Sequence, residues 1–511
     1  MIATEPSRLS RREVLALLAG TTFSSLFLRC APSGPPTPAS DVAGDDIHFQ
    51  SLTEVARLIE SKQISPVELT QIMLDRIAAI DSELHSYLTV MSDSALAAAR
   101  VAEEEIQAGN YRGPLHGVPI AVKDLCYTRG VRTTGALAVL VDFVPDYDAT
   151  VVSKLASAGA VLLGKLNLTE GAMAGYNREF EVPVNPWGDE LWAGVSSSGS
   201  GVATAAGLCF ASLGTDTGGS IRYPSMANGI VGLKPTYGRV SRYGVLTLAD
   251  TLDHVGPMTR SVADAAAVLQ VIAGHDPNDE TSLSEPVQDM VHELTLGVQG
   301  LRIGFNLTYV SEGVDPNLVA SIETAVEKLE SLGASIVDIE MPDSQEVRDA
   351  WFPICAYEAL AAHRAHFPAR ADEYGGYFRD FLEFGSTVTN DEYARLSDAR
   401  AKFSERFRSA LSTVDAVVFP PGGVPSALPK ELYYDSMAKM TPALLEILQP
   451  AFIVPADFAG TPTLSLPCGF STGGLPYTIQ LLGSALSEAM LCRIGHAYEQ
   501  ATDWHQRHPD V

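Results

Sequence analysis

The stretch Gly194–Arg222, GVSSSGSGVATAAGLCFASLGTDTGGSIR, decides how the rest of this chain is interpreted. Of the 28 residues from Ala193 to Ser220, 21 are Gly, Ala, Ser or Thr. Such small residues let backbone segments approach each other and a ligand closely. The closing residues 216–222 can turn several consecutive N–H groups toward one point, which is typical of an anion-binding nest. The stretch therefore predicts serine hydroxyls beside a place that stabilises negative charge.

A Gly- and Ser-rich run is more often a flexible loop than an active site, so the composition alone leaves both interpretations open. The run resembles the signature of the amidase signature family of serine hydrolases. That signature reads approximately G-G-S-S-G-G-S, then small residues, then D-T-G-G-S-[IV]-R. Ser196 and Ser220 are 24 residues apart, which fits the family's pair of catalytic serines. Val195 and Ser198 depart from the pattern, because the family usually has glycine at both positions.

A second motif lies upstream, in residues 113–124, GPLHGVPIAVKD. Ile120–Val122 is a short apolar strand between Gly and Pro residues, and Lys123 ends it. A lysine at such a position usually reaches water. This segment, however, resembles the family's lysine motif, approximately L-H-G-V-P-[IV]-x-[IV]-K-D. Burial away from countercharge lowers the pKa of a lysine, and only its neutral amine can accept a proton. His116 has no catalytic role in the family and is interpreted as structural.

The resemblance covers about residues 50 to 505 and implies an α/β fold. The expected fold is a single large domain, with a central mostly parallel or mixed twisted β-sheet flanked by helices. It also implies an amidase that hydrolyses a linear carboxylic amide, a C–N bond other than a peptide bond, to an acid and ammonia or an amine. In that mechanism Ser220 is the nucleophile and forms an acyl-enzyme, Ser196 follows a cis peptide and bridges, and Lys123 is the base. The oxyanion hole would consist of the backbone N–H groups of Thr217, Gly218, Gly219 and Ser220.

The composition is that of a globular protein with a strongly acidic balance. The chain has 511 residues, of which 46% are hydrophobic and 19% charged. It carries 62 acidic and 35 basic residues, for a formal charge of −27. Such a surface repels nucleic acid and anionic lipid headgroups, so neither is expected as a partner. The expected partner is a small-molecule amide, and a homodimer is left open.

The first forty residues are interpreted as a targeting segment and linker, and residues 47–511 as the amidase domain. Residues 10–15, SRREVL, resemble a twin-arginine export signal, and the apolar run that follows is too short for a stable membrane span. Export predicts a periplasmic or secreted protein; an ordinary amphipathic helix is the alternative. Five of the six cysteines lie beyond this segment, with no metal-ligand spacing, and most are expected to be small buried hydrophobes.

The rest of the chain alternates between helical and strand patterns, as expected for crossover units on a sheet. Ser51 and Ser65 each begin an S-x-x-E capping box, which predicts a helix start at both. Residues 277–296 are polar and acidic and are expected to form a surface loop. Further helices are expected at about 94–108, 150–158 and 316–332, and a terminal helix is expected through residues 496–500. Strands are expected at 160–163, 301–305, 334–339 and 417–419.

No metal or nucleotide cofactor is called for, because the chain lacks H-E-x-x-H, G-x-x-x-x-G-K-[ST] and G-x-G-x-x-G; the G-x-S-x-G elbow is also absent. Two rival functions remain: a glutamyl-tRNA amidotransferase A-like subunit, and an exported binding protein that kept the fold without catalysis. The motifs do not name the amide. Residues 342–450 match the family least, so substrate choice is expected to lie there.

Overall fold

An eleven-stranded mixed β-sheet runs through residues 47–511, the part of the chain that this computed structural model describes. The described residues belong to one compact unit, and the predicted targeting segment 1–40 lies outside them. In sheet order the strands are β1 (Tyr87–Val90), β3 (Val161–Leu166), β2 (Pro119–Lys123), β4 (Ala211–Asp216), β6 (His254–Thr259), β5 (Val231–Lys234), β10 (Thr463–Phe470), β11 (Pro476–Leu482), β9 (Ala416–Phe419), β7 (Arg302–Phe305) and β8 (Ser335–Asp338).

Parallel pairing occurs toward both ends of this sheet. Strand β2 is parallel to both β3 and β4, and β7 is parallel to both β8 and β9. The pairs through the middle, from β4 to β6, β5, β10, β11 and β9, are antiparallel, as is the edge pair β1–β3. The expected α/β fold with a mixed sheet and flanking helices is confirmed, and its parallel part is confined to crossover units with connecting helices.

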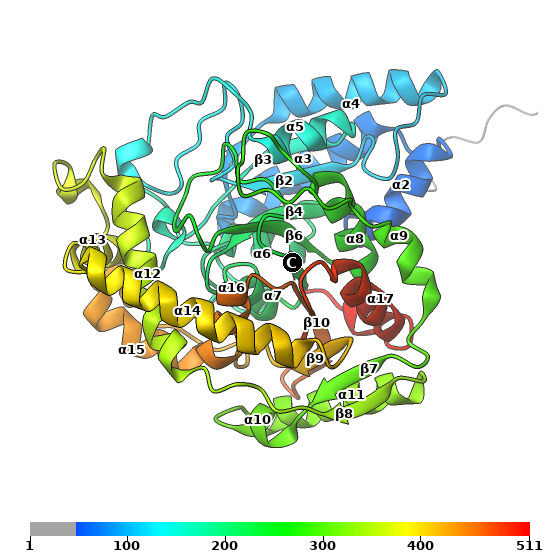
Figure 1. Cartoon of the computed structure of the whole chain (residues 1–511). Helices are drawn as coiled ribbons and strands as arrows, with labels where there is room; N and C mark the ends of the chain where they lie inside the picture. The colour runs from blue at the N-terminus through cyan, green and yellow to red at the C-terminus, as the bar shows by residue number, and fades with distance from the viewer. Residues whose placement is uncertain (1–46) are drawn as a thin grey trace, which may run out of the picture. The chain divides into compact units, whose positions relative to one another are not determined.

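Helices cover both faces of the sheet (Figure 1). The α-helices are α2 (Leu52–Glu60), α3 (Pro66–Leu84), α4 (Ser92–Gln107), α5 (Thr150–Ser157), α6 (Ser198–Ala205), α7 (Arg222–Asn228), α8 (Val262–Ile272), α9 (Met290–Glu293), α10 (Leu307–Ser311), α11 (Pro316–Ser331), α12 (Gln345–His363), α13 (Gly376–Gly385), α14 (Asn390–Leu411), α15 (Met437–Ile447), α16 (Val454–Ala459) and α17 (Glu488–Glu499). Short 3-10 helices occur at Ile47–Phe49, Ala138–Leu140, Glu170–Ala172, Leu294–Leu296, Ala371–Glu373, Lys430–Tyr434, Pro450–Phe452 and Trp504–Gln506.

Local sequence explains where the first helices begin. The Ser51 hydroxyl accepts a hydrogen bond from Glu54 N at 3.1 Å, and the Ser65 hydroxyl accepts one from Glu68 N at 3.0 Å. Each serine thus satisfies a backbone N–H that the helix leaves without a partner. Pro66 stands at the first position of α3, where its fixed φ suits the helix. Both predicted helix starts are confirmed.

The segment 277–296 is not the plain surface loop that its polarity predicts. It contains α9 and the 3-10 helix Leu294–Leu296. Met290 is fully buried, and Asp279 is also buried because its carboxylate accepts hydrogen bonds from Arg242 N and from Thr281 N and Oγ1. The surface-loop prediction is therefore wrong for part of this segment, since the acidic residue ties it to the body of the protein.

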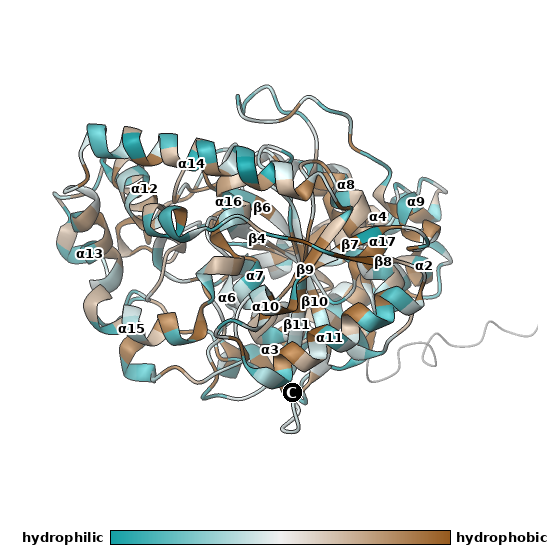
Figure 2. Ribbon diagram, turned by 60° about the horizontal axis from the view of Figure 1, so that its bottom comes forward, coloured by the Kyte–Doolittle hydropathy of each residue, from teal (hydrophilic) through white to brown (hydrophobic). Residues whose placement is uncertain are grey.

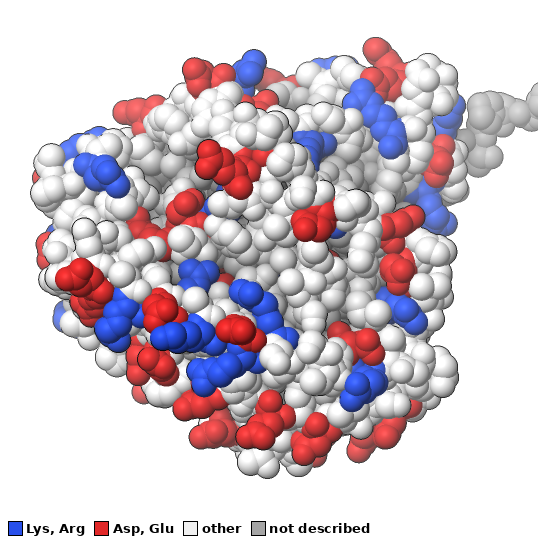
Figure 3. All heavy atoms as spheres, viewed as in Figure 1, with Lys and Arg blue, Asp and Glu red and all other residues white. Residues whose placement is uncertain are grey.

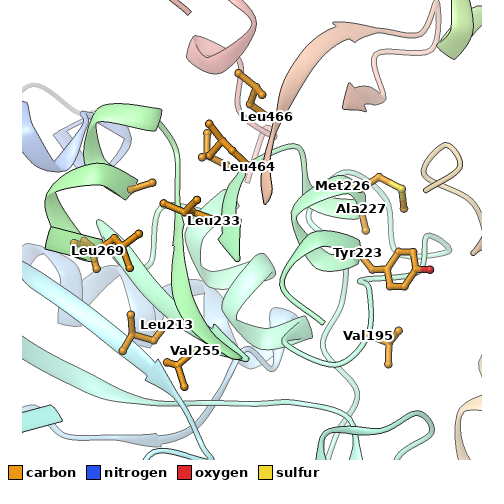
Figure 4. Close-up of a cluster of buried hydrophobic side chains, with 14 of the residues drawn as sticks. Val195, Leu213, Tyr223, Met226, Ala227, Leu233, Val255, Leu269, Leu464 and Leu466 are labelled. Atoms are coloured by element: carbon orange, nitrogen blue, oxygen red, sulfur yellow. The ribbon is translucent and has the colours of Figure 1, made fainter. Parts of the chain in front are cut away.

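The small-residue stretch lies at the centre of the molecule. Every residue of α6 and α7 is buried, and the apolar face of α7 packs into a cluster that includes Tyr223 and Met226. Figure 4 shows further members of this cluster on the neighbouring strands, such as Leu213 of β4 and Leu464 of β10. In Figure 2 hydrophobic segments such as β9 lie toward the middle of the molecule, while outer helices such as α14 carry hydrophilic faces. The core thus surrounds the segment that carries the serines.

On the surface, acidic and basic side chains are interspersed across the face shown in Figure 3, with acidic groups gathered along its lower edge. Within residues 47–511 no single helix is long and apolar enough to cross a bilayer. The helices Met437–Ile447 and Pro450–Ala459 have the required length and apolar composition only when taken together, and the chain bends by 69° between them. The five cysteines of the described chain are free thiols and are all buried, as expected.

Candidate active site

Two neighbouring parallel strands bring the predicted lysine beside the small-residue stretch. In β2 and β4, Ala121 pairs with Ser212 and Val122 with Leu213. Parallel strands end at the same edge of a sheet, so Lys123 at the end of β2 lies next to Thr215 near the end of β4. The chain that precedes α6 supplies Ser196 and Ser197 at the same edge.

The amine of Lys123 is surrounded by hydroxyl groups. Its Nζ lies 2.7 Å from Ser196 Oγ, 2.9 Å from Ser197 Oγ and 2.8 Å from Thr215 Oγ1. The lysine is fully buried, and no carboxylate of the described residues lies within ion-pair distance of Nζ. Burial without a countercharge lowers the pKa of Lys123 to about 7. Near neutral pH a large share of this amine is therefore uncharged and able to accept a proton.

A second buried lysine on the adjacent strand shows what is special about the first. Lys165 of β3 is as deeply buried as Lys123, yet its Nζ lies 3.0 Å from Asp124 Oδ1 in an ion pair. The same nitrogen donates to the hydroxyl of Thr133 at 2.5 Å. A paired charge is stable inside a protein, whereas an unpaired one is disfavoured. Only Lys123 of these two has the environment of a proton acceptor.

The two predicted serines lie close together along the backbone. Ser197 N donates to the carbonyl of Ser220 at 3.2 Å, and the Val195–Ser196 peptide is cis, as the resemblance implies. Ser196 is fully buried against Lys123, whereas Ser220 is 8% exposed. The Ser220 hydroxyl makes no hydrogen bond within residues 47–511, and Ser220 lines a cavity. Catalytic hydrogen bonds in unliganded enzymes are often long and tighten only when substrate binds.

Asp216 gives the loop before α7 its shape. Its carboxylate accepts hydrogen bonds from the backbone N–H groups of Gly219 at 2.7 Å, Ile221 at 3.0 Å and Arg222 at 3.3 Å. The guanidinium of Arg222 binds the same carboxylate in a two-pronged contact, with Nε and Nη2 at 3.0 and 2.9 Å from its oxygens. The D-T-G-G-S-[IV]-R motif thus closes on itself, because its first residue binds its last.

Arg222 also reaches a carboxylate far away in the sequence. Its Nη2 lies 2.6 Å from Asp457 Oδ2, and its Nη1 donates to the carbonyl of Ile453 at 3.0 Å. Burial alone would raise the pKa of Asp216, but the adjacent guanidinium holds it well below its usual range. Burial, opposed by the guanidinium and reinforced by the Asp216 charge, raises the pKa of Asp457 to about 7. Asp216 is therefore ionised in the folded protein, and Arg222 anchors the loop to α16.

The four predicted oxyanion donors differ in whether their N–H group already donates a hydrogen bond within the protein. The N–H groups of Thr217, Gly218 and Ser220 have no hydrogen-bond acceptor among the described residues. Gly219 differs, because its N–H already donates to Asp216 Oδ1. Three of the four donors are thus open to a ligand in this conformation, and Gly219 could only share its hydrogen.

Ser220 faces a cavity of about 350 Å³. One side of it comes from the segments near the predicted nucleophile, with Met173, Val195, Thr217 and Gly218 beside Ser220. The opposite side comes from the region that was expected to choose the substrate: Arg348, Asp349, Trp351, Phe352, Tyr377, Thr441, Leu444, Leu445, Leu448 and Pro450. Apart from the neighbouring pair Arg348 and Asp349, this far side is uncharged and mostly apolar.

Four contacts near Ser220 and Lys123 are not predicted by the sequence. Thr217 Oγ1 donates to Asp253 Oδ1 at 2.6 Å, and burial raises the pKa of Asp253 to about 6. Trp351 Nε1 donates to the Thr217 carbonyl at 2.9 Å. Ser197 and Thr215, both in the quoted stretch, complete the environment of the lysine amine. Ser197, Thr215 and Asp216 lie inside the quoted stretch, but their residue types alone do not indicate these contacts. Trp351 and Asp457 lie outside it, and no sequence pattern marks either residue.

His116 takes no part in this site. Its Nδ1 accepts a hydrogen bond from Arg112 N at 3.1 Å, and its Nε2 lies 3.1 Å from Glu105 Oε2. Burial lowers the pKa of His116. Its contacts join the loop before β2 to the end of α4, which agrees with the structural interpretation.

The chain is similar to known amidases along most of its length. The family described as Amidase matches residues 68–492. "Putative amidase AmiD" of Mycobacterium bovis is 42% identical over 467 residues, which cover 91% of this chain and 97% of the relative. The A-type subunit of glutamyl-tRNA(Gln) amidotransferase from Geobacter metallireducens is 40% identical over 481 residues, covering 89% and 98%. The solved peptide amidase of Stenotrophomonas maltophilia superimposes with a TM-score of 0.77 at 32% identity, covering 88% of this chain and 96% of that one.

Proposed function

The chain belongs to the amidase family, and on that premise we propose that it hydrolyses a linear carboxylic amide through an acyl-enzyme on Ser220. The observation that carries the proposal is the buried, unpaired amine of Lys123 in contact with Ser196 Oγ. An amide needs an activated nucleophile, a place for negative charge and a proton for its nitrogen. The groups around Ser220 can supply all three.

The proposed cycle moves one proton out and back. Neutral Lys123 accepts the proton of Ser196, Ser196 accepts that of Ser220, and Ser220 Oγ attacks the carbonyl carbon. When the tetrahedral intermediate collapses, the C–N bond breaks and the amine leaves with the proton returned from Lys123 through Ser196. Water then attacks the acyl-enzyme with the same relay as base and releases the acid. A Ser–Lys arrangement of this kind is a recognised variant of triad chemistry.

Backbone donors would hold the oxyanion during both attacks. We assign this role to the N–H groups of Thr217, Gly218 and Ser220, with Gly219 as a donor shared with Asp216. One well-placed oxyanion donor contributes about 3 kcal/mol to the stability of the transition state. The ionised Asp216 and Arg222 support this assignment, because they fix the loop before the substrate arrives.

The cavity supports an uncharged, apolar substituent beside the scissile amide. Its far side is formed by large apolar side chains, among them Phe352, Leu444 and Leu448. Burying such a substituent gains about 25 cal/mol for each Å² of apolar surface removed from water. A volume of about 350 Å³ has room for an aryl or branched aliphatic group.

The rival function in the same family is weaker on one count, because a chain with a formal charge of −27 repels tRNA. The cavity itself does not separate the two functions: a glutaminase must bind the ammonium and carboxylate of glutamine, and Asp349 and Arg348 line this cavity with the opposite charges. The similarity to the amidotransferase nevertheless makes glutamine an essential member of any substrate panel.

The proposal is tested by a panel of amides with released ammonia or amine as the readout. We expect turnover of phenylacetamide, hexanamide or 4-nitroacetanilide to exceed that of glutamine, and Ser220→Ala to abolish it. A fluorophosphonate probe should label Ser220 in the folded protein and nothing in Ser220→Ala. Folded protein that takes no label and hydrolyses no amide would instead favour a non-catalytic binding protein.

We further propose export of the chain by a twin-arginine route to the periplasm or beyond. The support is the sequence alone, in residues 8–28, where arginines precede an apolar run. Fractionation of cells that produce the full chain tests this proposal. We expect the protein outside the cytoplasm, and a variant with lysine in place of both Arg11 and Arg12 should stay inside. Export that is unaffected by the double replacement would contradict the twin-arginine route.

A further inference from the structure

Trp351 contacts both the substrate cavity and the loop before α7 that carries the predicted oxyanion donors. It belongs to α12, in the region that matches the family least, and its indole lines the cavity. The same indole donates its Nε1 hydrogen to the carbonyl of Thr217 at 2.9 Å. Both contacts come from one half-buried side chain, so what fills the cavity and what holds the loop are physically joined.

The indole lies directly against the loop backbone. A Cβ atom added at Gly218 would come within 2.4 Å of Trp351 Cζ2 and 2.6 Å of Cε2, distances that no real side chain tolerates. Gly218 is therefore needed at this position because the ring occupies the space a side chain would take. This close packing leaves the indole little freedom to turn, and its N–H keeps a fixed direction toward Thr217.

A peptide bond is planar, and in the trans form its C=O and N–H point in opposite directions. The carbonyl that Trp351 binds and the N–H of Gly218 belong to the same peptide. Fixing the Thr217 carbonyl therefore fixes the direction of the Gly218 N–H, one of the free donors of the loop. A hydrogen bond accepted at the carbonyl also polarises the peptide and makes its N–H a stronger donor.

Thr217 is held from its other side as well. Its hydroxyl donates to Asp253 Oδ1 at 2.6 Å, and the Asp253 carboxylate accepts hydrogen bonds from Leu248 N and Ala249 N at 2.9 and 3.1 Å. These bonds fix the side chain of Thr217 but not the rotation of the peptide that follows it. The contact from Trp351 is the one that acts on that peptide.

We propose that Trp351 is a positioning residue, whose indole N–H orients the Thr217–Gly218 peptide toward the oxyanion and so couples the substrate cavity to catalysis. The inference rests on the proposed function, since it assigns a role within the same reaction. Trp351 touches no reacting atom through this bond and acts only through Gly218 N–H. Its effect must therefore appear in the stability of the transition state rather than in ground-state binding.

The test replaces the N–H while keeping the ring. Trp351→Phe removes the donor, and 3-benzothienylalanine incorporated at position 351 keeps the indole shape with sulfur in place of the N–H. For the panel amide with the highest kcat/KM, we expect both variants to lose about 10-fold in kcat, with KM within about twofold in the benzothienylalanine variant, which keeps the shape of the cavity wall. Complete removal of a direct oxyanion donor costs about 10²–10³-fold, and an indirectly disturbed donor should cost less.

Inhibitors separate this role from simple packing. The aldehyde with the same acyl skeleton forms a tetrahedral adduct with an oxyanion, whereas the corresponding alcohol does not. The benzothienylalanine variant, which keeps the shape of the wall, should bind the aldehyde about 10-fold more weakly and the alcohol unchanged. Phe352→Leu, which alters the neighbouring ring of the wall without a bond to the loop, should change KM and affect both inhibitors alike.

The inference would be overturned if the benzothienylalanine variant kept the wild-type kcat, or if it bound the aldehyde and the alcohol more weakly by the same factor. Because the wild-type protein would still turn over the amide, the proposed function would stand. If the wild-type protein itself neither hydrolyses any amide nor takes a label at Ser220, the proposed function fails and this inference falls with it.

Discussion

The two walls of the Ser220 cavity are built on different physical principles. One wall, called the catalytic wall here, is lined mostly by small residues, and its Thr217 hydroxyl is held by a hydrogen bond to Asp253: Ala172, Met173, Ala174, Val195, Thr217, Gly218, Ser220 and Tyr223. The specificity wall, residues 348–352, 377 and 441–454, consists mostly of large apolar side chains on α12, α13 and α15 and the chain after α15. Figure 1 shows α12, α13 and α15 grouped at one side of the sheet. In the proposed mechanism, the comparison places the reaction chemistry and the choice of substrate shape in separate parts of one cavity.

The difference should be visible in how each wall responds to substitution. A hydrogen bond is lost when its donor or acceptor atom is removed, and the buried partner atom then has no hydrogen-bond partner, which costs free energy. Apolar contacts are graded, and neighbouring side chains can partly adapt. Changes in the catalytic wall should therefore act on every substrate equally, and changes in the specificity wall should act on some substrates more than on others.

The largest effect is expected at Lys123. Lys123→Met keeps most of the buried volume but removes the proton acceptor, and kcat/KM should fall about 10⁴-fold or more for every amide in the panel. Lys123→Arg is the matched control, because arginine keeps a positive charge that it cannot lose. It should be equally inactive, with circular dichroism confirming the fold of both. Substantial turnover by the arginine variant would show that charge, not proton transfer, is what the site requires.

Next in size is the buried ion network that shapes the loop. Arg222→Met leaves Asp216 and Asp457 facing each other without their shared guanidinium. Breaking a buried charge pair from one side costs about 3–5 kcal/mol of unfolding free energy. Chemical denaturation measures this loss. Arg406→Met, on the exposed side of α14, should leave stability within about 0.5 kcal/mol; equal losses in the two variants would mean that the network contributes nothing specific.

The specificity wall should give smaller and more selective effects. Leu448→Phe adds volume to the cavity wall. We expect kcat/KM for phenylacetamide to change by about 10-fold, while that for acetamide stays within about threefold. Leu307→Phe, at an exposed leucine outside the cavity, serves as control and should alter neither. A Leu448 variant that reduced both amides by the same factor would erase the distinction between the walls.

The smallest effect is expected from a buried residue behind the catalytic wall, which contacts Lys123 but is not part of the proposed relay. Ser197 Oγ contacts Lys123 Nζ, so Ser197→Ala removes one acceptor that stabilises the protonated amine. The pKa of Lys123 should fall further, and the acidic limb of the kcat/KM profile should move to lower pH. At alkaline pH we expect less than about fivefold loss, against about 10³-fold in Ser196→Ala. Equal losses in both variants would place Ser197 in the relay.

The sequence was most informative where a motif is local. Both capping boxes, the strand that ends at Lys123 and the two serines could be predicted, because each depends on neighbouring residues. The antiparallel centre of the sheet could not, since strand direction depends on connections such as that between β6 and β5. Asp457 and Trp351 were also missed, because each acts on the loop from more than 130 positions away. The roles of Lys123, Ser196, Ser220 and the oxyanion donors remain to be tested by activity.

The most direct test of the proton relay is the pH dependence of Ser220 phosphonylation by a fluorophosphonate, in which Ser220 Oγ bonds to phosphorus and fluoride leaves, measured between about pH 5 and 9. The pKa of Lys123 is lowered to about 7, so the amine gains a proton and loses its function as pH falls below that value. We predict a wild-type rate that rises through a single ionisation near pH 7, and a Lys123→Met rate that is at least about 10³-fold slower and independent of pH. A wild-type rate without this ionisation, or a Lys123→Met rate equal to it, would contradict the relay.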